Sequence, residues 1–231
     1  MWSNRNKYLI LSKVNFETVM KSRFFIAVLC SLLLFVGCES RLGEKTVLFN
    51  GHSLMGWNSV MQASEDGESR SVDVFGIKDG NIAIAGKPFG YIYTKERYSN
   101  YRLHVEWRWV AEGSNSGIFF HVNDADKVWP EAIECQLCSG KAGDIVLLGG
   151  AKIFDLESKE EFPIKERYGD FEKPVGKWNK ADIVCDSRQI SIYINGKLAN
   201  ECLSIRSSGH IALQSEGGPI EFRNVYLTKV E

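Results

Sequence analysis

An alternation of apolar and polar side chains with a period of two residues runs through most of the chain from Thr46 onward. In the segment Tyr101–Trp109 every odd position is aromatic or aliphatic, and every even position is charged or a histidine. This period is typical of a β-strand with one buried face. The same reasoning predicts strands at 117–122, 132–138, 182–185, 190–194 and 210–215, a hairpin at 75–84, and turns at 186–189 and at Asn195-Gly196.

Short strands with regular turns predict an all-β domain, a two-sheet antiparallel β-sandwich. No long amphipathic helix is found. Residues 139–176 are rich in glycine and charge with weak periodicity, so we expect long loops there, which commonly carry function on a β scaffold.

The first 37 residues have the features of a targeting segment. Lys21 and Arg23 precede the apolar run Phe24–Val36, which is too short to span a membrane as a helix. The following Gly37 and Cys38 complete the sequence LFVGC, which resembles the lipobox of bacterial lipoproteins, where the cysteine is lipidated.

These features predict the organisation of the whole chain. We expect translation to start at Met20, so that residues 1–37 are an upstream extension and a lipoprotein signal peptide. Residues 38–45 would be a short tether lipidated at Cys38, and 46–231 the folded domain. The expected location is the bacterial cell envelope, as a periplasmic or surface lipoprotein that touches the membrane through its lipid anchor alone.

The charge of the expected mature chain argues against nucleic acid as a partner. The first 37 residues hold five of the 28 basic residues and one of the 29 acidic ones, which leaves 23 basic and 28 acidic residues, a net charge of −5. A nucleic-acid footprint needs a basic excess or a basic stripe. Nucleophile-elbow, P-loop and dinucleotide-binding motifs are also absent from the sequence.

Four cysteines lie outside the signal and the anchor: Cys135, Cys138, Cys185 and Cys202. A secreted protein permits disulfides, and four cysteines allow three pairings, between which the sequence does not choose. Strand alternation would point Cys135 and Cys138 to opposite faces, and no second pair completes a zinc site. We expect buried free cysteines.

Strand parity also predicts one polar sheet face. We expect Trp107 and Trp109 in the core, with the opposite parity collecting the chemically interesting residues: His104, Glu106, Arg108, His121, Glu134 and Gln136. We expect His104, Glu106, Arg108, Glu134 and Gln136 to share one face.

Glu134 and Gln136 would lie about 7 Å apart along one strand. Glycosidases of the ordinary kind need two carboxyl groups, and this pair supplies one, so Glu106 on another strand is a candidate for the second. The alternative is that these groups simply solvate a sheet face.

Three further residues are candidates for the site. His121 opposes the apolar parity of its strand, and an imidazole can act as a base near neutral pH or as a metal ligand, although a lone histidine is more often structural. Arg108 is a candidate for binding a carboxylate or sugar hydroxyls, and Trp129 for stacking on a sugar ring.

Four motifs in order carry a resemblance to a known family. LFNGHSLMGW at 48–57, the segment 91–122 with GSNSGIFFHV, and the segments 174–197 and 209–227 are similar to the 3-keto-disaccharide hydrolase domain family, from about Val47 to Val230. The resemblance implies a concanavalin-like jelly roll, secretion, and cleavage of glycosides oxidised at C3, by hydrolysis or by a lyase–hydratase route.

The chemistry of such substrates needs no carboxylate nucleophile. A 3-keto group acidifies the C2 proton, so a base can form an enolate, the aglycone can leave from C1, and water can add back. By resemblance Glu134 would be the base or a metal ligand, while Gln136, Arg108 and Asn115 match polar positions of the family. A divalent metal ion that stabilises the enolate is the one cofactor compatible with this chemistry, and these residues do not define a site for it.

The sequence leaves other functions open. The same sandwich serves as a non-catalytic carbohydrate-binding module at the cell envelope, and fold alone does not separate binding from turnover. An interaction protein of the envelope would instead show a large exposed apolar patch.

Overall fold

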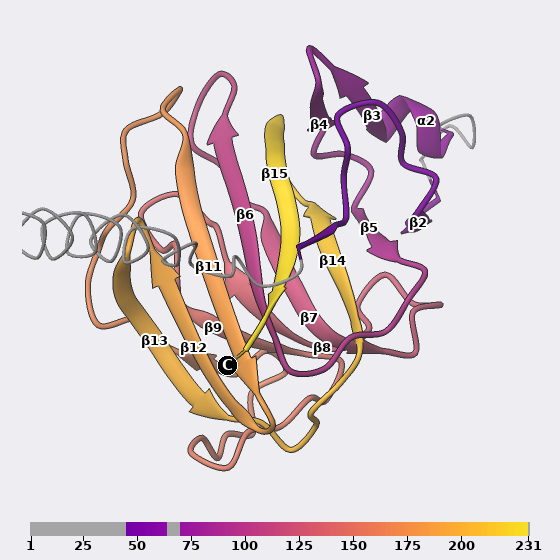
Figure 1. Cartoon of the computed structure of the whole chain (residues 1–231). Helices are drawn as coiled ribbons and strands as arrows, with labels where there is room; N and C mark the ends of the chain where they lie inside the picture. Colours follow the sequence, from indigo (N-terminus) through magenta and orange to yellow (C-terminus); the bar gives the residue numbers. More distant parts are fainter. Residues whose placement is uncertain (1–44, 64–69, 231) are drawn as a thin grey trace, which may run out of the picture. The chain divides into compact units, whose positions relative to one another are not determined.

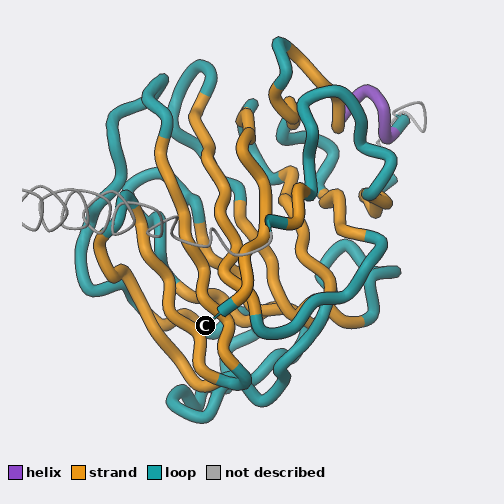
Figure 2. Tube along the Cα trace, viewed as in Figure 1, coloured by secondary structure: helices purple, strands orange, loops and turns teal. Residues whose placement is uncertain are grey.

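The computed structural model describes residues 45–63 and 70–230, and they form two antiparallel sheets packed face to face (Figure 1). This confirms the predicted all-β sandwich of the jelly-roll type. Its one described helix is the single turn α2 (Ser71–Val74). Loops and turns join the strands at both ends of the sandwich (Figure 2).

Sheet A forms one layer. Its strands, in spatial order, are β13 (Lys197–Leu203), β12 (Gln189–Ile194), β11 (Asn179–Asp186), β6 (Tyr101–Trp109), β15 (Ile220–Lys229), β4 (Asn81–Ile84) and β3 (Phe75–Lys78), and β1 (Thr46–Val47) also pairs with β15.

Sheet B forms the second layer. Its strands, in spatial order, are β10 (Ile164–Lys165), β9 (Ile145–Leu148), β8 (Glu131–Gln136), β7 (Gly117–Asn123), β14 (His210–Ser215), β5 (Gly90–Thr94) and β2 (Trp57–Met61).

The core between the sheets is built as strand parity predicts. Trp107 and Trp109 of β6 are fully buried there, together with Ile118 and Phe120 of β7. Large aromatic side chains bury 150–250 Å² each, on the order of several kcal/mol of hydrophobic free energy, so these tryptophans anchor sheet A on sheet B.

The predicted turns are also confirmed. Asn195 and Gly196 both have positive φ, 51° and 81°, which is the conformation that a two-residue hairpin with matching strand twist requires. The hairpin β3–β4 turns at Asp79-Gly80, and β11–β12 turns at Ser187 and Arg188.

Two expectations about segments are wrong in part. Residues 139–176 are not loops throughout, because β9 and β10 within them extend sheet B. The strand expected at 132–138 ends at Gln136, so Cys138 lies beyond it. The expectation of free cysteines is confirmed for the described residues: Cys135, Cys185 and Cys202 are buried, Cys138 is partly exposed, and none forms a disulfide.

The expected single polar face is wrong. His104, Glu106 and Arg108 belong to β6 in sheet A, whereas Glu134 and Gln136 belong to β8 in sheet B. Both groups point away from the core, but out of opposite sides of the sandwich. Parity fixes the two faces of a strand within its own sheet and does not tell which sheet the strand joins.

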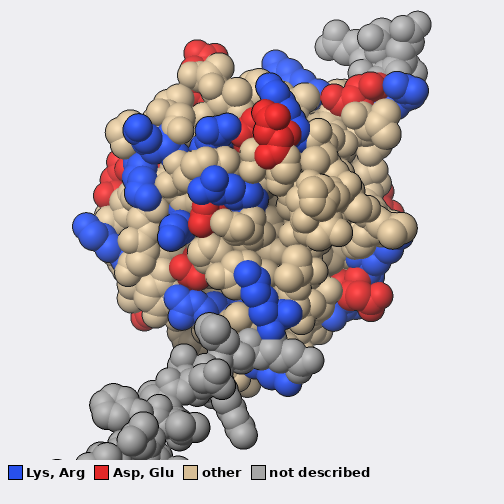
Figure 3. All heavy atoms as spheres, turned by 45° about the horizontal axis from the view of Figure 1, so that its top comes forward, with Lys and Arg blue, Asp and Glu red and all other residues tan. Residues whose placement is uncertain are grey.

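The predicted start at Met20 and lipidation at Cys38 concern residues outside the described ones and stay predictions. No helix in the ranges 45–63 and 70–230 is long and apolar enough to cross a membrane. Acidic and basic side chains are interspersed on the face shown in Figure 3.

Candidate active site

The outer face of sheet B, which points away from the core, carries an apolar cluster of its own. Tyr91 of β5, Phe119 of β7, Val146 and Leu148 of β9 and Ala212 of β14 are buried in it. Partly buried Trp129 packs on its edge, with its ring 6.2 Å from that of Phe89 and 5.9 Å from that of Phe162. An antiparallel sheet normally turns a polar side to water, whereas these outer side chains are covered, and the partly exposed rings of Trp129 and Phe162 lie at their edge.

Glu134 stands in the middle of this face. It pairs with Phe119 on one side and with Val146 on the other, its side chain is 2% exposed, and its Oε1 has no hydrogen-bond partner. The carboxyl group lies over Gly117, where an added Cβ would be 1.9 Å from Oε1. The missing side chain of Gly117 therefore provides the space that the carboxyl group occupies.

A second carboxyl group approaches from the end of β14. Glu216 follows this strand and forms a β-bridge with Asn115. Its Oε2 accepts a hydrogen bond from Nε2 of Gln214 at 2.7 Å, and the Asn115 side chain also hydrogen-bonds to it. Glu216 is partly exposed, unlike Glu134.

The two carboxyl groups differ in their electrostatic surroundings. Burial, reinforced by the charge of Glu216, raises the pKa of Glu134 well above its ordinary value. Burial also raises the pKa of Glu216, but the hydrogen bonds from Asn115 and Gln214 oppose this shift by stabilising the anion. Glu134 is therefore the group that holds a proton, and Glu216 the group that ionises first, an arrangement that separates an acid from a base.

Gln136 lies next to this pair with a fixed orientation. Its side-chain oxygen accepts hydrogen bonds from the backbone N–H groups of Leu137 and Cys138, both at 2.9 Å. These bonds hold the side-chain oxygen of Gln136 against the backbone. The NH₂ group of the same amide therefore points away from the backbone.

Glu106 cannot supply the second carboxyl group to Glu134. It lies on the outer face of sheet A, where Nε of Arg223 donates to its Oε2 at 2.8 Å. Arg108 on the same face is paired with Glu221 at 2.7 Å and stacks on Trp178. These groups form ion pairs on the opposite side of the sandwich from Glu134.

His121 is also not where parity predicts it. A β-bulge between Phe120 and Asn123 places His121 in the left-handed region, with φ 53°. The extra residue shifts the alternation, so Val122 joins the outer cluster while the His121 ring contacts Phe120 and Tyr101 of the core. His121 therefore does not meet Glu134.

Of the residues predicted from the sequence, the structure brings Glu134, Gln136, Asn115 and Trp129 to one face. Sequence reasoning missed Glu216 and Gln214. The signal was present, because the outer parity of β14 through Ala212 and Gln214 continues to Glu216, one residue beyond the predicted strand.

A metal ion does not fit this donor set. In the described ranges no group of three or more His, Cys, Asp or Glu side chains could hold one. The polar groups here are the carboxyl groups of Glu134, which retains its proton, and of Glu216, together with side-chain amides.

The raised pKa of Glu134 predicts a pH dependence of stability. The unfolded chain releases this proton near the ordinary pKa of 4.5, whereas the folded protein keeps it to higher pH. Between the two values the unfolded state binds fewer protons, so we expect the free energy of unfolding to fall as pH rises through this window, by about 1.4 kcal/mol per unit of pKa shift.

Urea unfolding of the wild type and of Glu134→Gln at a series of pH values above about 4.5 measures this effect. The variant should lose this decline, so that its stability relative to the wild type increases with pH. Parallel curves for the two proteins would contradict the buried, protonated state of Glu134.

Comparison with known proteins shows the family to which the chain belongs. Residues 44–228 match the model of the 3-keto-alpha-glucoside-1,2-lyase-like domain. A 3-keto-disaccharide hydrolase of Bacteroides thetaiotaomicron is 24% identical over 228 residues, which cover 77% of this chain and 76% of that protein.

Solved structures share the fold. A glycosyl hydrolase candidate from Parabacteroides distasonis superposes with a TM-score of 0.61 at 20% identity, over 82% of this chain and 94% of that one. The β-glucanase of Bacillus licheniformis superposes with a TM-score of 0.55 at 10% identity, over 84% and 100% of the two chains. Because the family model spans most of its length, the chain belongs to the family of 3-keto-alpha-glucoside-1,2-lyase-like domains.

Proposed function

We propose that this protein is a carbohydrate-active enzyme that cleaves the glycosidic bond of 3-keto-glycosides on the outer face of sheet B. The observation that carries the proposal is the pair of carboxyl groups there: Glu134, buried with an unpartnered oxygen, and Glu216, hydrogen-bonded and partly exposed. Family membership and the 3-keto-disaccharide hydrolase relative support the substrate class.

In the first step Glu216 removes the C2 proton of the substrate. The C2–H electron pair forms the enolate with the C3 carbonyl, and the NH₂ group of Gln136 donates a hydrogen bond to the enolate oxygen. The partial burial that raises the pKa of Glu216 makes its carboxylate a stronger base than one in water.

In the second step the enolate re-forms the C3 carbonyl and expels the aglycone oxygen from C1. Glu134 gives its proton to this oxygen, and a C1–C2 double bond results. Water then adds at C1 and returns a proton to Glu134. C2 receives a proton from Glu216, whose partly exposed carboxyl group exchanges its proton with solvent before this step. The net reaction is hydrolysis, and release before hydration makes the enzyme a lyase.

The aromatic surface around the pair suits a sugar ring. Trp129 and Phe162 are partly exposed and pack on the buried cluster that contains Phe119, the residue paired with Glu134. The C–H faces of a pyranose are apolar and pack on such rings, which would hold C1 and C2 near the carboxyl groups.

Product analysis in D₂O tests this mechanism. A 3-keto-glucoside incubated with the enzyme, with and without a chelator, should yield 3-keto-glucose carrying deuterium at C2. Cleavage without deuterium at C2 would contradict elimination and support a direct hydrolysis. Loss of cleavage with the chelator would contradict a mechanism that uses the chain's own groups alone.

Substitution Gly117→Ala should misplace the Glu134 carboxyl group. The new Cβ would overlap Oε1 and lie 2.6 Å from Cδ, so the carboxyl group must move. We expect a loss of about 10²-fold in turnover and a destabilisation of about 1–3 kcal/mol. Steady-state kinetics and urea unfolding measure both, and Gly56→Ala, where the added Cβ meets open space and the backbone does not have a positive φ, controls for loss of a glycine. Wild-type turnover of Gly117→Ala would contradict the proposed position of the acid.

A carbohydrate-binding module without turnover is the second candidate, favoured by the extent of the aromatic cluster. It would bind the 3-keto-glucoside in calorimetry and return it unchanged. Binding with no product at any enzyme concentration would replace the catalytic proposal.

A further inference from the structure

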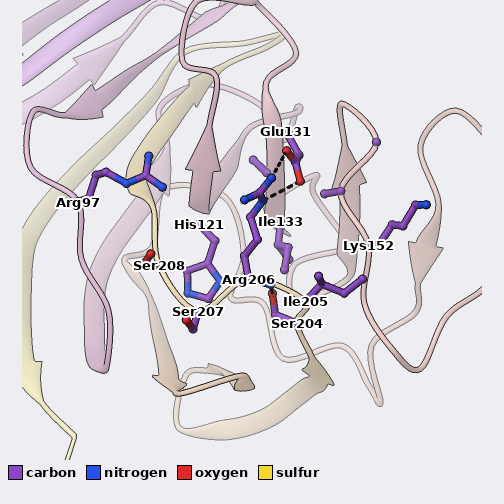
Figure 4. Close-up of a pocket in the computed structure, with 13 residues that line it drawn as sticks. Arg97, His121, Glu131, Ile133, Lys152, Ser204, Ile205, Arg206, Ser207 and Ser208 are labelled. Atoms are coloured by element: carbon purple, nitrogen blue, oxygen red, sulfur yellow. Dashed lines mark hydrogen bonds and ion pairs between the residues drawn. The ribbon is translucent and has the colours of Figure 1, made fainter.

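A cavity of about 530 Å³ opens at the end of the sandwich where β7 ends and β8 begins (Figure 4). Its walls come from the β5–β6 loop, the end of β7, the start of β8, the segment after β9, and the loop between β13 and β14. The cavity does not include Glu134 or Glu216, so it is separate from the proposed active site.

His121 is a buried polar group on the wall of this cavity. Its side chain is 1% exposed, and neither ring nitrogen has a hydrogen-bond partner in the described part of the protein. A buried polar group without a partner costs about 1–3 kcal/mol, and native proteins keep few of them. An imidazole with two such nitrogens on a cavity wall is therefore a position that a ligand would complete.

The backbone holds His121 in this position. The bulge gives it a left-handed conformation, and Gly209 packs so closely that an added Cβ there would lie 2.2 Å from the His121 carbonyl carbon. The His121 ring also packs against Tyr101 in a T-shaped arrangement, with 6.5 Å between ring centroids. In Figure 4 the ring extends into the space beside Ser207.

The charges around the cavity are mainly positive. Arg97, Lys152 and Arg206 line it, against one acidic residue, Glu131. Glu131 is already bound by Arg206 through two hydrogen bonds of 2.8 and 2.7 Å. Asp124 acts on Arg206 from outside the cavity wall.

His121 is uncharged in these positively charged surroundings. Burial, and in second place the charge of Arg97, lowers its pKa to about 4. The ring is neutral at neutral pH and offers one N–H donor and one acceptor.

We propose that this cavity binds a small oxyanion, a carboxylate or a phosphate or sulfate group, between Arg97 and His121. The anion would give Arg97 a counter-charge and accept the hydrogen bond of the imidazole N–H, while the Ser207 hydroxyl can donate as well. A cation would face three basic residues. A neutral ligand could satisfy His121 but would leave the charge of Arg97 uncompensated.

Histidine side-chain NMR of the full-length protein tests the proposal. The His121 signals, identified by their loss in His121→Asn, are followed while inorganic phosphate, sulfate or glucuronate is added, with glucose as the uncharged counterpart of glucuronate. Asparagine tolerates the left-handed backbone, so this variant keeps the fold. We expect a saturable shift with at least one oxyanion and none with glucose, and the responding anion identifies the group that binds.

Two arginine variants complete the test. Arg97→Gln should weaken the binding about tenfold or more, because it removes a charged hydrogen-bond donor. Arg102→Gln changes another exposed arginine, which lies on β6 and is paired with Asp182, and it should leave the binding unchanged. The proposal is overturned if none of the three oxyanions gives a saturable shift, if glucose shifts the signals as glucuronate does, or if Arg97→Gln binds like the wild type.

Discussion

Glu134→Gln is expected to lower the turnover of a 3-keto-glycoside with an alkyl aglycone by about 10² to 10⁴, the range that a general acid or base contributes. The substitution keeps the size of the side chain and removes the proton that the buried carboxyl group holds. Since the carboxyl group is neutral in the folded protein, the amide introduces no new charge, and we expect the fold to persist. Steady-state kinetics and circular dichroism of the variant measure the two effects.

The leaving group separates an acid from any other role of Glu134. A 3-keto-glucoside of nitrophenol needs little protonation of its departing oxygen, so the variant should recover most of its activity with it. Glu106→Gln is the matched control, because Glu106 is buried like Glu134 but lies on the other side of the sandwich. Its turnover with both aglycones should equal that of the wild type. An equal loss with both aglycones would show that Glu134 does not protonate the leaving group, and full activity with the alkyl aglycone would remove it from the site.

Strand parity was sufficient to predict the two sides of each strand. It placed Trp107 and Trp109 in the core and Glu134 and Gln136 on an outer face, because successive side chains point to opposite sides of a pleated strand. It failed for Glu106, because the pairing of β6 with β11 and β15 depends on hydrogen bonds between segments far apart in the sequence.

His121 shows a second limit. Alternation continues only while each residue pairs with one partner, and the bulge after Phe120 inserts an extra residue. Bulges of this kind often contain glycine or asparagine, whereas here a histidine adopts the left-handed conformation, so the sequence carries no local mark of it. The same irregularity that removes His121 from the active site places it in the cavity at the end of the sandwich.

The predicted chemistry changed for a related reason. From the sequence, Glu134 is a base or a metal ligand, and both roles need an ionised carboxylate. Complete burial beside Glu216 makes Glu134 the protonated member of a pair instead, and burial of a side chain on an outer face depends on the neighbouring strands and loops that cover it. An apolar outer face is the feature that strand alternation alone does not predict.

Glu216→Gln is expected to abolish proton removal from C2 as well as cleavage, with a loss of about 10² to 10⁴ in turnover. The variant keeps the size of the side chain next to Asn115 and Gln214 but removes the charge that accepts the proton. It should therefore exchange no deuterium into C2 of the substrate in D₂O. It should also gain nothing from a nitrophenol aglycone, because the step that it blocks precedes departure of the aglycone.

This pattern is the opposite of that expected for Glu134→Gln, so the two variants together assign the base and the acid. Exchange at C2 at the wild-type rate in Glu216→Gln would place the base elsewhere, and loss of exchange in Glu134→Gln alone would reverse the two roles.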